Sequence, residues 1–131
     1  MTNINEIHIK FIPASEFRYE TVGDYWIEGE TLQIRVVKMN DTIHNCLVAV
    51  HEFVEWMMTD YRGLAEEDIM AFDKEFEKEN DAGVHHDTVE PGFDSRSPYL
   101  REHTFATSVE MMICGFLGIS WTNYDKIVME Q

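Results

Sequence analysis

The chain has 131 residues, of which 25 are acidic and 10 are basic, giving a formal net charge of −15. A surface with this charge repels phosphate backbones, so it argues against nucleic-acid binding and suits solubility, cation binding or a basic partner. The length is typical of one domain, over residues 1–131, that buries its own core. No apolar stretch could span a bilayer, and the two distant cysteines, Cys46 and Cys114, form no motif, so we expect a cytoplasmic protein without a membrane partner.

The first third of the chain predicts three strands. Residues 7–11 alternate between apolar and polar side chains, which is typical of a strand with one face in water. Two further strands are predicted at about Gly23 to Glu28 and Leu32 to Val37, with a turn at Gly29 between them. Their short connection predicts an antiparallel β-hairpin.

After the hairpin the apolar residues recur at steps of three and four, which predicts helices. The first helix is expected between an N-cap at Asp41 and a C-terminal stop at Gly63. Its apolar stripe is expected to pack inward and contains Ile43, Leu47, Val50, Val54, Met57 and Tyr61.

A second helix is predicted over residues 66–78, and a third from the cap Ser97 to Gly118. Trp121 and Tyr124 are expected to fold back on the core in a short C-terminal turn. Strands followed by helices indicate an α+β fold, with an N-terminal antiparallel hairpin or small sheet followed by three helices. The apolar stripe of the third helix contains Phe105, Val109, Met112, Ile113 and Phe116.

Polar side chains at the edges of the two stripes form a candidate metal site. His51 and Glu55 are four residues apart on the first helix and share one face, while His103 and Glu110 are two turns apart on the third helix. If the helices pack through their stripes, these four side chains meet. Zinc accepts imidazole and carboxylate ligands, and catalytic zinc usually has three of them plus water. We therefore predict a site for zinc or another divalent metal, with Glu110 as a fourth ligand or as an orienting group for His51, Glu55 and His103.

The stretch HEFVE, which begins at His51, resembles the His-Glu-x-x-His motif of the zincin metalloproteases. The resemblance covers the hairpin and the first helix, residues 23–62, and implies a zincin-like fold. It also implies that His51 is the first ligand, His103 the downstream ligand, Glu52 the general base and a peptide bond the substrate. Glu55 replaces the second histidine of the motif, so metal binding is implied more strongly than peptidase activity. The chain also resembles small uncharacterised proteins of phages and prophages, which implies no activity.

Other interpretations of these residues stay open. His51 with Glu55 is also the pattern of a hydrogen-bonded pair on a helix surface. A ferritin-like di-iron bundle is excluded because the residues three positions before His51 and His103 are Val48 and Leu100, where that fold requires glutamate.

Two alternatives to a hydrolase also stay open for the function of the chain. One is an acidic binding or inhibitor module that blocks a basic protein and uses any metal only for structure. The other is a structural protein without a site. The hairpin edge could hold an extended peptide by strand addition. In the long irregular segment 80–97, His85 and His86 are either an exposed pair or part of a lid. The sequence does not indicate an oligomeric state.

Overall fold

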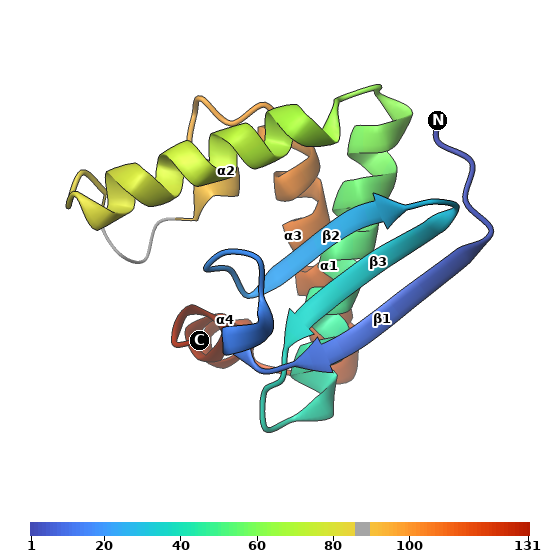
Figure 1. The fold of residues 1–131 in the computed structure, drawn as a ribbon. Helices are drawn as coiled ribbons and strands as arrows, with labels where there is room; N and C mark the ends of the chain where they lie inside the picture. Colours follow the sequence, from blue (N-terminus) through green and yellow to red (C-terminus); the bar gives the residue numbers. More distant parts are fainter. Residues whose placement is uncertain (86–89) are drawn as a thin grey trace.

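The computed structural model describes residues 1–85 and 90–131 (Figure 1). It confirms the α+β class, with a small sheet at the N-terminus followed by helices. The described residues form four helices where the sequence predicted three. The strands are β1 (Glu6–Ile12), β2 (Gly23–Glu28) and β3 (Thr31–Val37), and the helices are α1 (Thr42–Tyr61), α2 (Glu66–Asp81), α3 (Leu100–Leu117) and α4 (Trp121–Met129).

The sheet has the strand order β1-β3-β2 and is mixed. The predicted hairpin is confirmed, because β2 and β3 pair antiparallel, with Gly23 opposite Val36. Its turn contains Gly29 at a φ of +65°, a conformation that glycine adopts without steric cost. β1 runs parallel to β3, with Ile7 opposite Leu32. The sequence predicted the strand β1 but not its partner.

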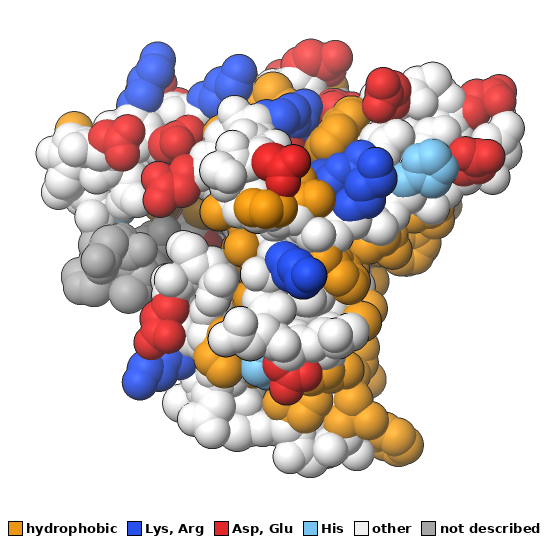
Figure 2. Space-filling view, turned by 60° about the horizontal axis from the view of Figure 1, so that its bottom comes forward, with side chains coloured by type: hydrophobic (Ala, Val, Ile, Leu, Met, Phe, Trp, Pro, Cys, Tyr) orange, Lys and Arg blue, Asp and Glu red, His pale blue; other side chains and the backbone are white. Residues whose placement is uncertain are grey.

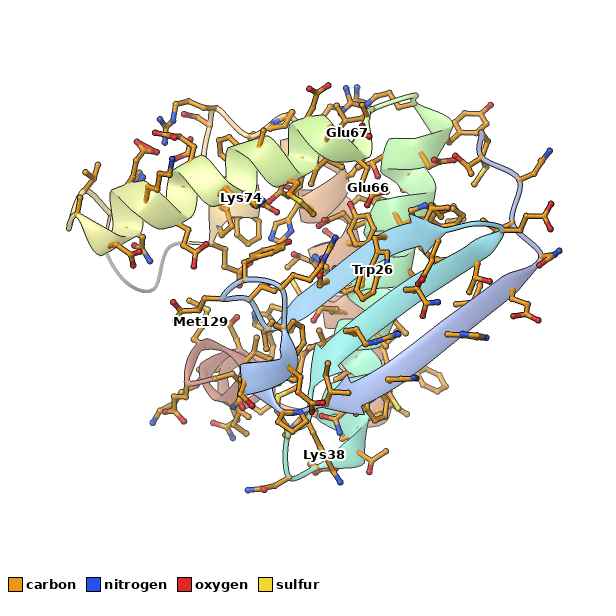
Figure 3. The ribbon with its side chains drawn as sticks, in the orientation of Figure 1. Trp26, Lys38, Glu66, Glu67, Lys74 and Met129 are labelled. Carbon is orange, nitrogen blue, oxygen red and sulfur yellow. The ribbon has the colours of Figure 1, made fainter. Side chains whose placement is uncertain are left out.

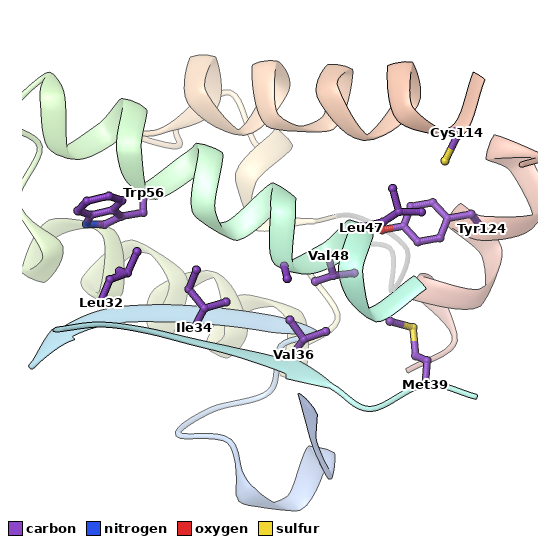
Figure 4. Packing of buried hydrophobic residues seen from close by; sticks show 10 residues of the cluster. Leu32, Ile34, Val36, Met39, Leu47, Val48, Trp56, Cys114 and Tyr124 are labelled. Atoms are coloured by element: carbon purple, nitrogen blue, oxygen red, sulfur yellow. The ribbon is translucent and has the colours of Figure 1, made fainter. Parts of the chain in front are cut away.

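Helix α1 begins and ends where the sequence predicted. The Asp41 side chain accepts a hydrogen bond from the backbone N–H of Ile43 at 3.3 Å, as an N-cap does. After the helix, Gly63 has a φ of +81°. In Figure 4, α1 lies between the sheet on one side and α3 on the other. The main core cluster lies between these layers and includes Leu32, Ile34, Val36, Leu47, Val48, Trp56, Cys114 and Tyr124.

The predicted inward stripes of α1 and α3 are confirmed only in part, because Leu47 is buried and Ile43 and Ile113 pack, partly buried, against the core. Of the six stripe residues of α1 only Leu47 is buried, and none of the five stripe residues of α3 is buried. The buried side of α1 instead contains His51, Glu52 and Glu55. The physical reason is that α1 packs between the sheet and α3. Its buried residues are those that face either of these two elements, and they do not coincide with the apolar stripe. A helical wheel locates an apolar stripe but does not identify what covers it.

The remaining helices differ from the prediction in their bounds. Helix α3 begins at Leu100, because the Ser97 side chain accepts a hydrogen bond from the backbone N–H of Tyr99 at 3.2 Å in a turn before the helix. The predicted C-terminal turn is the nine-residue helix α4, capped by the Ser120 side chain, which accepts from the N–H of Asn123 at 3.2 Å. Over the described part of the chain, no helix is both long and apolar enough to cross a membrane.

Candidate metal centre

Helices α1 and α3 bring three of the predicted ligands to one point. The distance from His51 Nε2 to Glu55 Oε2 is 3.1 Å, from His51 Nε2 to His103 Nδ1 3.1 Å, and from His103 Nδ1 to Glu55 Oε2 2.8 Å. All three side chains are buried. They lie at the centre of the buried side of the helices and not at the rim of the apolar stripes. This His-Glu-His cluster could hold a metal ion.

The three inner atoms form a triangle of the size that a metal ion requires. Ligand atoms about 2.0–2.1 Å from a tetrahedral zinc ion lie about 3.3 Å from one another. The sides of the observed triangle, 2.8 to 3.1 Å, are slightly shorter. A small outward movement of the side chains is therefore enough to admit the ion.

The outer nitrogen of each imidazole contacts a carboxylate. His51 Nδ1 pairs with Glu110 Oε1, and His103 Nε2 pairs with Glu90 Oε2 at 2.8 Å. A carboxylate at this position accepts the ring N–H and thereby directs the lone pair of the other nitrogen into the cluster. Histidines that bind metals have this arrangement almost always. Of the two roles predicted for Glu110, its position fits the orienting one, because it lies on the far side of the His51 ring from the cluster.

Two tyrosines hold the carboxylates in place. The Tyr124 hydroxyl donates to Glu110 Oε2 at 2.5 Å, and the Tyr25 hydroxyl donates to Glu55 Oε1 at 3.3 Å. The His103 ring packs directly on the backbone of Gly92, where any side chain would overlap it. The cluster therefore has a supporting shell from β2, the turn at residues 91–93 and α4.

The hydrogen bonds of the cluster change the proton affinities of its members. Burial alone would lower the pKa of His103, but its hydrogen bonds with Glu55 and Glu90 outweigh burial and raise the pKa to about 9. The pKa of His51 is raised well above its usual value, because Glu110 and Glu55 outweigh burial. Burial would raise the pKa of Glu55, but its bonds with both histidines lower it to about 2. Without a metal ion the site therefore retains positive charge as protons on its histidines.

Glu52, the predicted general base, is buried beside the cluster. Its carboxylate packs against the backbone of Gly23 at the start of β2. Within residues 1–85 and 90–131, no hydrogen bond to this carboxylate is present. Burial raises the pKa of Glu52 well above its usual value, and repulsion by Glu55 acts in the same direction. A buried carboxyl group with a raised pKa binds its proton more tightly than an ordinary glutamate, which suits a group that accepts and returns a proton.

A cavity of about 840 Å³ opens onto the cluster. Its walls come from the segment before β2, from α2, from the turn at residues 91–93 and from α4. Glu66 at the start of α2 and Met129 at the end of α4, both labelled in Figure 3, belong to the lining. Among the described residues, the lining contains ten acidic side chains and one arginine, Arg18, which pairs with Asp24 at 2.9 Å. The cavity is therefore strongly acidic.

The wall formed by α2 contains a polar network around Asp73. The hydroxyl groups of Tyr99 and Tyr19 both donate to the Asp73 carboxylate, the latter at 3.4 Å. Burial raises the pKa of Asp73 to about 7, although these hydrogen bonds act in the opposite direction. His85 does not line the cavity; its ring stacks on Phe76 with 4.3 Å between centroids. His86, the other predicted lid residue, lies outside the described residues.

Apart from Glu110, the sequence did not predict the supporting residues of the site. Glu90 and Gly92, in the segment before α3, and Tyr25 on β2 lie outside the two helices that carry the ligands, and no local pattern connects them with a metal. Tyr124 had a usable signal. Glu110 shares the side of α3 that carries His103, and a carboxylate buried there requires a hydrogen-bond donor. The next tyrosine along the chain after Glu110 is Tyr124, which donates that hydrogen bond.

Comparisons with known proteins add no assignment to this geometry. No protein-family model, curated protein or solved structure matches the chain at a significant level.

Proposed function

We propose that this protein is a metal-dependent hydrolase with a zincin-like site, in which His51, Glu55 and His103 hold a zinc ion and Glu52 is the general base. One observation carries the proposal. Three lone pairs, on His51 Nε2, His103 Nδ1 and Glu55 Oε2, converge on one point, while the outer nitrogen of each imidazole is held by a carboxylate. Such convergence is repulsive unless a proton or a cation lies between the atoms.

The donor set supports a transition metal and disfavours calcium or magnesium, which prefer ligands made only of oxygen. Two imidazoles and one carboxylate suit zinc and also suit the non-haem iron(II) of oxygenases. Glu52 favours zinc and hydrolysis, because hydrolysis requires a base beside a metal-bound water.

In this proposal each residue around the cluster has a defined role. Zinc, when bound, lowers the pKa of a coordinated water to near neutrality. Glu52, whose carboxyl group is buried beside the cluster, would accept a proton from the attacking water and return it to the leaving group. Glu110 and Glu90 keep the two imidazoles in the orientation and tautomer that point into the site. The acidic cavity walls hold the substrate.

An extended peptide with basic side chains is the substrate class that fits this cavity. The backbone N–H of Ile27 donates to Glu66 Oε2 at 3.4 Å, so it points away from β3. Alternation along the strand places the backbone groups of Tyr25 on the same free edge, beside the cavity. A peptide can add to such an edge, and the acidic lining attracts basic side chains. The phage resemblance and the cytoplasmic location stay predictions.

Metal analysis of protein purified without added metal tests the proposal. We expect about one zinc per chain in the wild type and almost none in His51→Ala and His103→Ala, because each variant removes one of three ligands. His8→Ala is the matched control, because His8 is exposed on β1, outside the cluster, and should retain the metal. A metal-free wild type, or equal metal content in all variants, would refute the site.

A second variant separates catalysis from a structural metal. Glu52→Gln should retain the metal and the fold but lose hydrolysis of a mixture of basic peptides, because the amide cannot accept the proton. If Glu52→Gln retains full activity, or if the metal-loaded wild type cleaves none of the peptides, the acidic binding module with a structural metal becomes the better interpretation.

A further inference from the structure

The side of the molecule opposite the cavity has a large exposed apolar surface, which we call the outer apolar face. In Figure 2, hydrophobic side chains gather in a band along the right of the view. Phe116 is 90% exposed, Tyr61 80% and Met112 73%. The outer apolar face comprises Ile7 and Ile9 of β1, Met57 and Tyr61 of α1, and Phe105, Met112 and Phe116 of α3.

Helix geometry places these residues on one side of the molecule. Helices α1 and α3 pack side by side and both direct their site residues towards the cavity. The exposed apolar residues of α3 lie on the arc opposite His103, and Met57 and Tyr61 of α1 lie about 80–120° around the helix from His51. Ile7 and Ile9 pair with Leu32 and Ile34 of β3, so they lie on the inner face of the sheet, but α1 does not cover them. The strand and the two helices therefore contribute to one surface.

The outer apolar face has almost no charge, in a chain with a net charge of −15. Between Thr104 and Ser120 the only charged residue is Glu110, which is buried in the site. Between Thr42 and Thr59 the only acidic residues are Glu52 and Glu55, which are also buried, and no lysine or arginine occurs. Acidic side chains surround the cavity but are absent from these helical stripes.

The area of the face matches what a stable dimer buries. At roughly 200 Å² for a large side chain, the exposed fractions of the seven residues amount to about 800 Å². The largest apolar patch on a monomer is usually about 300–600 Å², whereas each partner of a standard interface buries about 800 Å².

We propose that the outer apolar face binds a second copy of this chain, forming a symmetric homodimer. Two copies of a protein with a charge of −15 repel each other over most of their surfaces. An uncharged face is where two such copies can meet without that repulsion, and in a two-fold dimer the same residues serve both partners. The two cavities then open away from the interface, so both sites stay accessible.

The molar mass in solution tests the proposal. Sedimentation equilibrium of the full wild-type chain over the micromolar range should give twice the 15.4 kDa of one chain. Met112→Glu and Phe116→Glu should each weaken association at least about tenfold, because each buries an unpaired charge in the interface. Both positions are exposed in the monomer, so circular dichroism should show an unchanged fold.

A control of equal charge makes this result specific. Val84→Glu adds the same charge at an exposed apolar position after α2, outside the outer apolar face, and should leave the dimer intact. The proposal is overturned if the wild type is monomeric over the whole range, which would assign the face to a different partner. It is equally overturned if both face variants dimerise as the wild type does.

Discussion

The two sides of α1 and α3 depart from the usual distribution of side chains, although both helices also bury apolar core residues. Towards the cavity, the helices bury His51, Glu55, His103 and Glu110. On the other side they expose large apolar residues such as Phe116. Most helices of small proteins bury their apolar side and expose their charges. Buried polar side chains and exposed large apolar ones are both costly for the fold of one chain, which is the physical basis of the two proposals.

The buried side is possible because most of its charges have partners. A buried and unpaired ion costs several kcal/mol, whereas a hydrogen-bonded one costs far less. Glu55 and Glu110 accept hydrogen bonds from tyrosines and contact histidines. Glu52 has no such donor among the described residues, and its pKa is raised first by burial and then by repulsion from Glu55.

The largest predicted effect concerns Asp73, a buried carboxyl group on the α2 wall. Its pKa of about 7, against 3.8 when unshifted, means that the folded state binds this proton more tightly than the unfolded state. Stability should therefore fall as pH rises from about 4 to 7 and change little from this group above that range. Asp73→Asn retains an acceptor for Tyr99 but cannot ionise, so it should be more stable than wild type at pH 7 by on the order of 3 kcal/mol.

Urea unfolding of the metal-free protein at several pH values measures this difference. The wild-type and Asp73→Asn stabilities should coincide near pH 4 and separate towards pH 7. Parallel curves over that range would show that Asp73 does not bind its proton more tightly in the folded state.

The local elements of the fold could be predicted from the sequence. Alternation and a glycine turn identified the hairpin, and Asp41 with Gly63 fixed both ends of α1. These signals act over a few residues. The pairing of β1 with β3 and the burial of each helix depend on contacts across the chain, which periodicity does not contain. Helix α4 had a local signal in the sequence, the cap formed by Ser120, although only a turn was predicted there.

The site was predicted better than its surroundings, and for the wrong reason. The spacing of His51 with Glu55 and of His103 with Glu110 correctly placed four side chains together. The prediction had the apolar stripes of the two helices packing against each other, whereas α1 and α3 meet through the sides that contain the site residues. Residues on one helix face stay together whichever way the helix turns, so the cluster was recoverable although the orientation was not.

A smaller effect is expected from removing the support of His51. Glu110→Gln should weaken zinc binding about 10–100-fold, roughly 1.4–2.7 kcal/mol, because the orienting acceptor loses its charge. Tyr124→Phe removes the hydrogen bond to Glu110 and should act in the same direction. Competition with a zinc chelator of known affinity gives both values.

Glu102→Gln is the matched control for that comparison. Glu102 is also buried on α3, but it pairs with Arg62 at 2.5 Å and not with a histidine. The Glu102→Gln variant should have a lower free energy of unfolding than the wild type and an unchanged affinity for zinc. Equal loss of zinc affinity in Glu102→Gln and Glu110→Gln would mean that the effect comes from general loosening of α3.

The smallest predicted effects concern two glycines, Gly92 in the turn that packs against His103 and Gly115 within α3. A methyl group at Gly92 would overlap the His103 ring, which two hydrogen bonds hold in place, so Gly92→Ala should lower the free energy of unfolding by about 1–2 kcal/mol. It should also weaken zinc binding, because His103 must move. Gly115 lies within α3 with open space around it, so Gly115→Ala should stabilise the helix by up to about 1 kcal/mol and leave zinc binding unchanged. Urea unfolding and chelator competition on both variants decide the point, since equal responses would show that the cavity side is no more tightly packed than the exposed side.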